Sequence, residues 1–219
     1  MAIQTSKSAL GEIKGSVGDD TIYKWRSLTV IRQRLRFKDK NKISPKQRKQ
    51  INIFRLVTAT LYQIESAIKM GYQQQKNTVM TPRNAAVSYH MLNAVVGDPQ
   101  NPRIDPAKIK ISHSIWATQN VWKPSLIATA NKQITVTWEL NPYPQKSTRL
   151  DDQVVIQLYH EDNHHFYPCT IPLRDALVFN RTLNNKDVGK LLHCYMFVAS
   201  ANGKLVSPTA YLGTVTVLA

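Results

Sequence analysis

The feature that most constrains this chain is a change of hydrophobic pattern at residue 109. From there to the end, helical periodicity is absent, and short apolar runs are separated by Asn, Gly and Pro. Because side chains alternate along a strand, each run can bury one face. Regular short strands of this kind are typical of a β-sandwich. We expect strands at residues 109–115, 125–129, 133–140, 153–159, 165–171, 176–179, 191–199 and 210–217.

Two amphipathic helices are predicted before this region. Ser44 stands at an N-cap position, with Pro45 at the first helical position. Thr81 and the proline after it repeat that signature, and Gly97 is the predicted end of the second helix. We expect the first helix to end near Gly71. Its apolar residues recur at three- and four-residue steps and form its predicted packing face: Ile51, Phe54, Val57, Leu61, Ile64 and Ile68.

Residues 11–37 are predicted to form a β-meander. Three β-patterned runs, at 12–17, 21–25 and 29–37, are separated by turn residues. In the third run, apolar and cationic side chains alternate, so they fall on opposite faces of a strand. We therefore expect a ladder of arginines on one side of this strand. The apolar face is Ile31, Leu35 and Phe37, and the cationic face is Arg32, Arg34 and Arg36.

Positive charge is concentrated in the same part of the chain. The formal net charge is +15, and residues 24–55 carry most of the excess, with Asp39 as the acidic residue among them. This distribution favours a polyanionic partner, either nucleic acid or an acidic protein surface. The alternative is a solvated basic face that maintains solubility. The residues expected to dock on the partner are Arg32, Arg34, Arg36, Lys38, Lys40, Lys42 and Arg48.

The last hundred residues resemble a fibronectin type III domain. Ile134-Thr-Val-Thr-Trp138, followed by Asn141-Pro142, is similar to the second strand of that fold with its buried tryptophan. Tyr195-Met-Phe-Val198, then Gly203, is similar to its tyrosine-bearing strand and the following hairpin. The resemblance implies a sandwich over residues 120–219. Residues 1–119 would then form an α+β region with the β-meander and two helices.

The chain as a whole also resembles an uncharacterised family of small basic proteins encoded in Bacteroidota genomes. The resemblance implies the same two-part layout and brings no established activity. A phage or prophage origin for some members is our inference. The motifs that carry the resemblance are Gly11-Glu-Ile-Lys-Gly-Ser-Val-Gly18, Met80-Thr-Pro-Arg-Asn-Ala-Ala86, Asn93-Ala94, Gly97, Ile104-Asp105 and Val206-Ser-Pro-Thr-Ala-Tyr-Leu-Gly213.

One cluster carries metal-ligand residue types, His160-Glu-Asp-Asn-His-His165. Imidazole and carboxylate groups bind zinc, copper or nickel, but this cluster lies between two predicted strands, where a solvated hairpin tip is expected. The sequence has no phosphate-binding loop and no nucleophile motif. We therefore expect no enzyme activity, no metal and no cofactor. Cys169 and Cys194 are expected to be free thiols, with a disulfide across the sandwich as the alternative.

These observations favour a non-enzymatic structural and docking component of a large assembly, such as a bacteriophage virion protein. The expected partners are neighbouring subunits in a homo- or hetero-oligomer, with DNA as a further polyanion. The alternative is a sequence-nonspecific nucleic-acid-binding protein, and an enzyme using the histidine cluster is a third reading. The first ten residues lack the apolar core of a signal peptide, and no run is long enough to span a membrane. We expect the protein in the virion or the bacterial cytoplasm.

Overall fold

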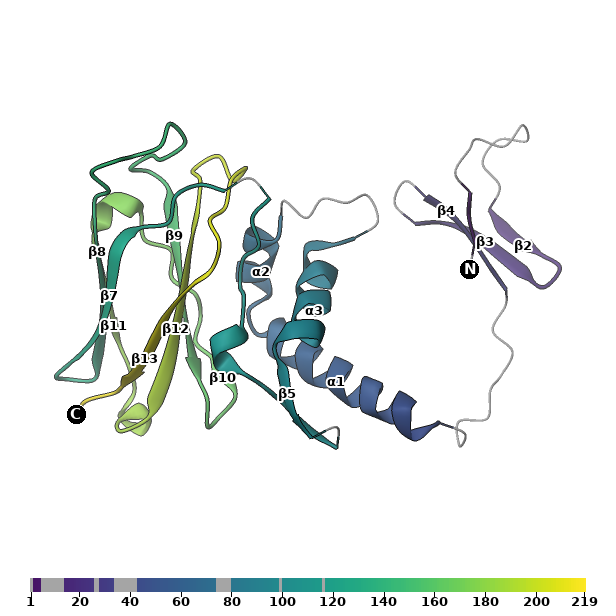
Figure 1. The fold of residues 1–219 in the computed structure, drawn as a ribbon, viewed down its shortest axis with the longest axis horizontal. Coiled ribbons are helices and arrows are strands. Elements are labelled where there is room, and N and C mark those ends of the chain that lie inside the picture. The colour runs from purple at the N-terminus through teal and green to yellow at the C-terminus, as the bar shows by residue number, and fades with distance from the viewer. Residues whose placement is uncertain are drawn as a thin grey trace.

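The chain has an α+β fold that is rich in antiparallel sheet (Figure 1). The described residues begin with a four-stranded sheet, continue through three α-helices and a hairpin, and end in two sheets of four and three strands that pack face to face. None of the described helices is long and apolar enough to cross a membrane. The computed structural model describes residues 2–4, 14–25, 28–33, 43–73, 80–98, 100–115 and 117–219.

The two C-terminal sheets enclose a core between them. One sheet has the order β10-β9-β12-β13 and the other the order β11-β8-β7. Trp138 lies in this core with only 3 % of its surface exposed, and its indole nitrogen donates to the Arg174 carbonyl at 2.8 Å. The two sheets therefore form the β-sandwich expected from the short alternating runs. The strands are β7 (Trp122–Thr129), β8 (Gln133–Glu139), β9 (Gln153–His160), β10 (His165–Phe166), β11 (Val178–Thr182), β12 (Leu191–Ala199) and β13 (Ala210–Thr216).

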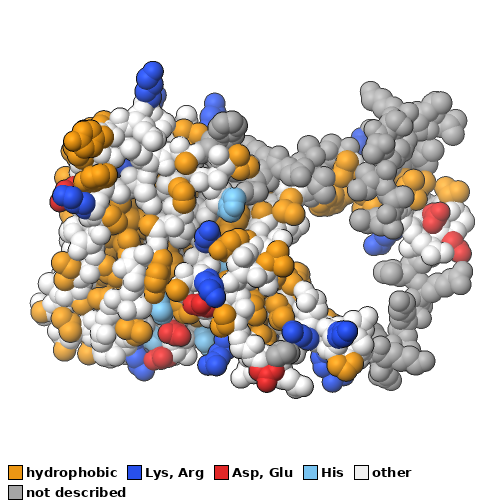
Figure 2. Space-filling view, in the orientation of Figure 1, with side chains coloured by type: hydrophobic (Ala, Val, Ile, Leu, Met, Phe, Trp, Pro, Cys, Tyr) orange, Lys and Arg blue, Asp and Glu red, His pale blue; other side chains and the backbone are white. Residues whose placement is uncertain are grey.

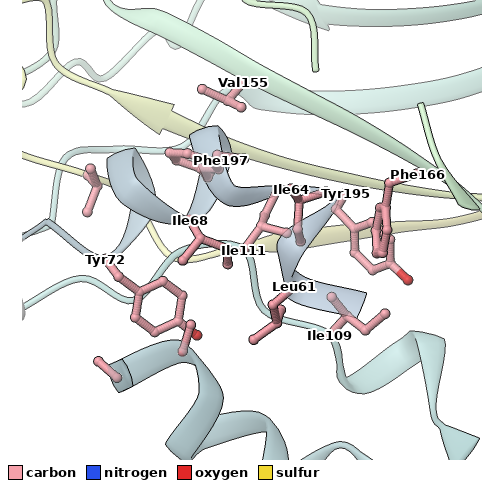
Figure 3. Close-up of a cluster of buried hydrophobic side chains, with 14 of the residues drawn as sticks. Leu61, Ile64, Ile68, Tyr72, Ile109, Ile111, Val155, Phe166, Tyr195 and Phe197 are labelled. Carbon is pink, nitrogen blue, oxygen red and sulfur yellow. The ribbon is translucent and has the colours of Figure 1, made fainter. Parts of the chain in front are cut away.

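The two central strands of the four-stranded sheet are buried on both faces. Along β12, Cys194 and Met196 point into the core between the sheets, whereas Tyr195 and Phe197 point to the opposite side. That opposite side is covered by the helices, as Figure 3 shows around Tyr195 and Ile64. Double burial explains why apolar residues follow one another along β9 and β12 instead of alternating regularly with polar residues.

The helices begin where the sequence predicts. Ser44 and Thr81 cap the helices α1 (Pro45–Tyr62) and α3 (Pro82–Asn93), and each has its proline in the first turn. The first helix does not continue to Gly71 as expected, because it breaks after Tyr62 and resumes as α2 (Glu65–Gly71). The backbone leaves the helical conformation at Ile64, directly after Gln63. The Gln63 side chain donates to the His164 carbonyl and accepts from the Phe166 amide, both at 3.0 Å, and so ties the chain to the β9–β10 hairpin.

The connection from α3 to the sandwich differs from the prediction. Gly97 does not end a helix but lies in a hairpin of β5 (Val95–Asp98) and β6 (Asn101–Ile104), which precedes a short 3₁₀ turn (Pro106–Lys108). The expected strand at 109–115 is not a strand. Ile109 and Ile111 are buried among the helices, and the Lys110 amide donates to the His90 ring at 3.2 Å. The segment therefore runs between the helices and the sheet as an extended connector. It does not form a strand because the amides of Lys110 and Ser112 donate to side chains instead of to a neighbouring strand.

The N-terminal sheet has the order β1-β4-β3-β2 and lies apart from the sandwich in Figure 1. Its most buried described residue is Val30, which pairs with Tyr23. Val30 and Arg32 are two residues apart on β4, so their side chains point to the same face of the strand. The face predicted to be cationic therefore also carries the most buried residue of the strand. Leu35 and Phe37 lie outside the described residues. The strands are β1 (Ala2–Gln4), β2 (Gly15–Val17), β3 (Asp20–Trp25) and β4 (Leu28–Gln33).

The packing of the helices bears on how the chain is divided. Val57, Leu61 and Ile68 from the helices share one hydrophobic cluster with Val155 and Phe197 from the sheet. The cluster thus spans both sides of the boundary expected at residues 119 and 120. The division into domains 1–119 and 120–219 stays a prediction.

Candidate docking surface

The N-terminal half of α1 is held in place by a capping box. The Ser44 hydroxyl accepts from the Gln47 amide at 3.2 Å, and the Gln47 side chain accepts from the Ser44 amide at 2.9 Å. These reciprocal bonds satisfy backbone donors that a helix start leaves without partners. Pro45 adds a backbone angle already suited to the first turn. The start of the helix is therefore locally determined, although residues 45–51 are exposed.

Four cations lie on α1, and no acidic residue lies on it. Lys46 is in the first turn, and Arg48 and Lys49 follow directly. A cation near a helix N-terminus faces the positive end of the helix dipole, which costs roughly 0.3–1 kcal/mol. Within the described part of the chain, neither these three nor Arg55 forms an ion pair. Their placement therefore does not stabilise the helix.

Two large apolar side chains are exposed among these cations. Ile51 is 44 % exposed and Phe54 is 52 % exposed. They are three residues apart and therefore neighbours on the helix surface. Figure 2 shows blue and orange side chains gathered together at the lower right, where α1 begins. We call Arg48, Lys49, Ile51, Phe54 and Arg55 the α1 surface.

The start of α1 also borders a hollow of about 480 Å³. Its wall combines cations with neutral polar groups, a chemistry that suits anionic ligands. Gln100, from the β5–β6 turn, also lines it. The described lining residues are Ile43, Pro45, Lys46, Arg48, Lys49, Asn52 and Gln100.

The structure describes only some of the expected docking residues, and these lie on different elements. Arg48 lies on the α1 surface, whereas Arg32 lies on β4 with its guanidinium carbon 5.5 Å from the centre of the Tyr23 ring. Arg34, Arg36, Lys38, Lys40 and Lys42 lie outside the described residues, so the arginine ladder stays a prediction.

Sequence reasoning misassigned the two apolar members of the α1 surface. Ile51 and Phe54 were expected on the packing face of the helix, together with Val57 and Leu61. Val57 and Leu61 are 0 % and 1 % exposed, so the packing face is real over that stretch. The periodic pattern, however, continues towards the N-terminus into a stretch where the described part of the chain leaves Ile51 and Phe54 exposed.

The histidine cluster forms the β9–β10 hairpin, but it is not wholly solvated. His160 is 1 % exposed, whereas His164 and His165 are exposed. The Tyr159 hydroxyl lies 3.1 Å from His164 Nδ1, and Glu161 Oε2 lies 3.2 Å from Nε2 of His193 on β12. Among the residues that the structure describes, no three His, Cys, Asp or Glu side chains are grouped to hold a metal ion.

Both cysteines are free thiols. Cys194 is fully buried in the core between the sheets, and burial raises the pKa of its thiol to about 12. A thiol in that environment is inert, because the thiolate is the reactive form. Cys169 is half-buried, and its sulfur lies 3.6 Å from the Ser66 hydroxyl.

Comparison with known proteins adds a family and no activity. A protein-family model, described as a family of unknown function (DUF6266), matches residues 12–213. No curated protein matches the chain.

Proposed function

Because the chain belongs to this family of unknown function, we propose a function from its surface: it is a non-enzymatic docking component of a large assembly, such as a bacteriophage virion. The observation that carries the proposal is the α1 surface, where Arg48 and Arg55 lie three and four residues from the exposed Ile51 and therefore on its side of the helix, beside the exposed Phe54. The helices and the sandwich serve as the folded body that presents this surface.

The combination of charge and apolar area favours an acidic protein surface as the partner. Arginine binds carboxylates through a planar fork of donors, which suits a protein interface. Covering a large apolar side chain completely contributes about 1.5–3 kcal/mol. A phosphate backbone offers nothing apolar to Ile51 and Phe54, whereas a neighbouring subunit can bury both.

We assign the sandwich to the fibronectin type III kind. The order β11-β8-β7 in one sheet and β10-β9-β12-β13 in the other supports this assignment, as does the buried Trp138 on β8. Sandwiches of this architecture occur in many interaction proteins, but the fold alone does not determine function. The docking role therefore rests on the α1 surface.

The alternative function is sequence-nonspecific binding of nucleic acid, including DNA. It is supported by the hollow at the start of α1, where Lys46, Arg48 and Lys49 lie beside a helix N-terminus. Helix N-termini and cations both attract phosphate. In this alternative the exposed Phe54 would stack on a base.

Photocrosslinking at position 54 in cells that produce the assembly tests the proposal. A photoreactive phenylalanine analogue at Phe54 should give one discrete protein crosslink. The Arg48→Gln and Lys49→Gln double variant should lose that crosslink while staying folded. The matched control is the same analogue at Leu92 on α3, which is 82 % exposed and should give no such product.

Two other outcomes would count against protein docking. A crosslink to nucleic acid, resistant to protease, would favour the alternative. That result should be accompanied by binding of the purified protein to unrelated DNA sequences that weakens steeply with salt. A smear of products that is equal at positions 54 and 92 would contradict both functions of the α1 surface.

A further inference from the structure

A second hollow, of about 470 Å³, lies at the end of the sandwich where β9 meets the β9–β10 hairpin. It is separate in sequence from the α1 surface, and the proposed docking function makes no use of it. Its wall is built from side chains of both sheets and of the 3₁₀ turn Asn185–Asp187. The residues that decide its chemistry are His160, His165, Tyr167, Arg181, Lys186 and Asp187.

His160 contributes a buried donor without a partner. Its Nδ1 lies 3.4 Å from the Asn163 amide, which can only donate, so Nδ1 accepts and carries no proton. The neutral ring then carries its proton on Nε2. That nitrogen is buried and has no hydrogen-bond partner. Leaving such a donor unpaired costs about 1–3 kcal/mol, and the group that would satisfy it is an acceptor.

Arg181 contributes a half-buried positive charge. It extends from β11, donates to the Pro168 carbonyl at 2.7 Å and lies with its guanidinium carbon 5.3 Å from the centre of the Tyr167 ring. Burial lowers the pKa of Arg181, because removing the cation from water is unfavourable. In the described part of the chain, no carboxylate forms an ion pair with it. Its remaining N–H groups can therefore bind a ligand.

The carboxylate in the wall is already engaged. Asp187 is 2 % exposed, and its Oδ2 accepts from the Asn184 amide at 3.1 Å. Burial and the neighbouring Asp187 carboxylate raise the pKa of Tyr167. Asp187 thus stabilises the turn, while Arg181 and the exposed Lys186 leave the wall with a net positive charge.

We propose that this hollow binds an oxyanion, that is, a carboxylate or phosphate group. Arg181 supplies the main charge and its free N–H donors, Lys186 adds a second cation at the rim, and His160 supplies the Nε2–H donor. Because Nε2 is itself covered, contact with the anion requires the imidazole to rotate about its Cβ–Cγ bond. Arginine suits both oxyanions, since its planar donors match two oxygens at once.

Anion titration of the isotope-labelled full-length protein, followed by NMR, tests the site. Sodium phosphate and sodium acetate are the two probes, each compared with sodium chloride at equal ionic strength. We expect saturable shifts of the Arg181 side-chain N–H and the His160 ring with at least one probe. Response to phosphate alone would identify a phosphate site, and response to acetate would identify a carboxylate site.

Variants separate this site from nonspecific attraction to a basic protein. Arg181→Gln should weaken binding by about tenfold or more, because a charge-assisted bond is lost. His160→Phe should also weaken it, whereas His160→Gln keeps an N–H donor and should preserve part of the affinity. The matched control is Arg149→Gln, an exposed arginine at the other end of β9. Shifts that fail to saturate, that chloride reproduces, or that survive in folded Arg181→Gln would overturn the proposal.

Discussion

The Tyr195 hydroxyl donates a 2.7 Å hydrogen bond to the Pro106 carbonyl, 89 residues away in the chain. Tyr195 is fully buried on β12, and Pro106 opens the 3₁₀ turn that leads into the connector. The bond therefore links the sandwich to the segment that follows the helices. It also shows that Tyr195 faces away from the core between the two sheets.

We expect Tyr195→Phe to destabilise the protein by about 1–3 kcal/mol, because the half-buried Pro106 carbonyl would lose its side-chain donor. Urea unfolding measures the change in the free energy of unfolding. Tyr143→Phe is the matched control, since Tyr143 is 78 % exposed and its variant should be nearly neutral. Equal effects of the two variants would mean that the bond to Pro106 contributes nothing.

Trp138→Ala should cost about 3–5 kcal/mol, because a large side chain would leave a cavity in the core between the sheets. The variant would also remove the donor to the Arg174 carbonyl. Thermal or urea unfolding followed by circular dichroism gives the value. Trp122→Ala provides the comparison, since Trp122 is 36 % exposed and should lose much less stability. A nearly neutral Trp138→Ala would contradict its place in the core.

His90 should make the protein less stable in mild acid. Its Nδ1 lies 2.7 Å from the Ala86 carbonyl and therefore donates, while Nε2 accepts from the Lys110 amide. Burial lowers the pKa of His90 below its ordinary value of about 6.5. Below about pH 6.5, His90 therefore binds a proton in the unfolded chain, whereas in the native state it binds one only at a lower pH. The free energy of unfolding should therefore fall as the pH decreases from about 7 towards the folded-state pKa.

Urea unfolding across this pH range checks the sign for His90. His90→Gln should flatten the pH dependence, whereas His165→Gln, at an exposed histidine, should retain it. An unchanged slope in folded His90→Gln would assign the effect to other groups.

Gly71→Ala should destabilise the protein, although glycine to alanine normally stabilises a helix by roughly 1 kcal/mol. A Cβ atom at Gly71 would lie 2.1 Å from the Ile111 carbonyl oxygen, where the connector crosses the end of α2. Either the helix or the connector would have to move. Urea unfolding gives the sign directly, and a gain in stability would show that the two segments do not approach this closely.

Much of the local structure can be predicted from the sequence, because its causes are local. Ser44 and Thr81, each followed by a proline, mark helix starts through hydrogen bonds to residues three positions ahead. The strands β8, β9, β12 and β13 agree with their predicted runs to within one residue at either end. The resemblance of residues 134–138 to a fibronectin type III strand also predicts correctly that Trp138 is buried.

The tertiary structure alone decides what each apolar or polar group contacts. The sequence leaves open that the helices cover the outer face of β9 and β12, so that Tyr195 packs against helices instead of the opposite sheet. It also leaves open that the helix is interrupted at Ile64, next to the point where Gln63 binds the hairpin. Ile51 and Val57 obey the same periodicity, yet one is exposed and the other buried. Periodicity reports which side of a helix a residue occupies, whereas burial depends on whether a distant part of the chain reaches that side.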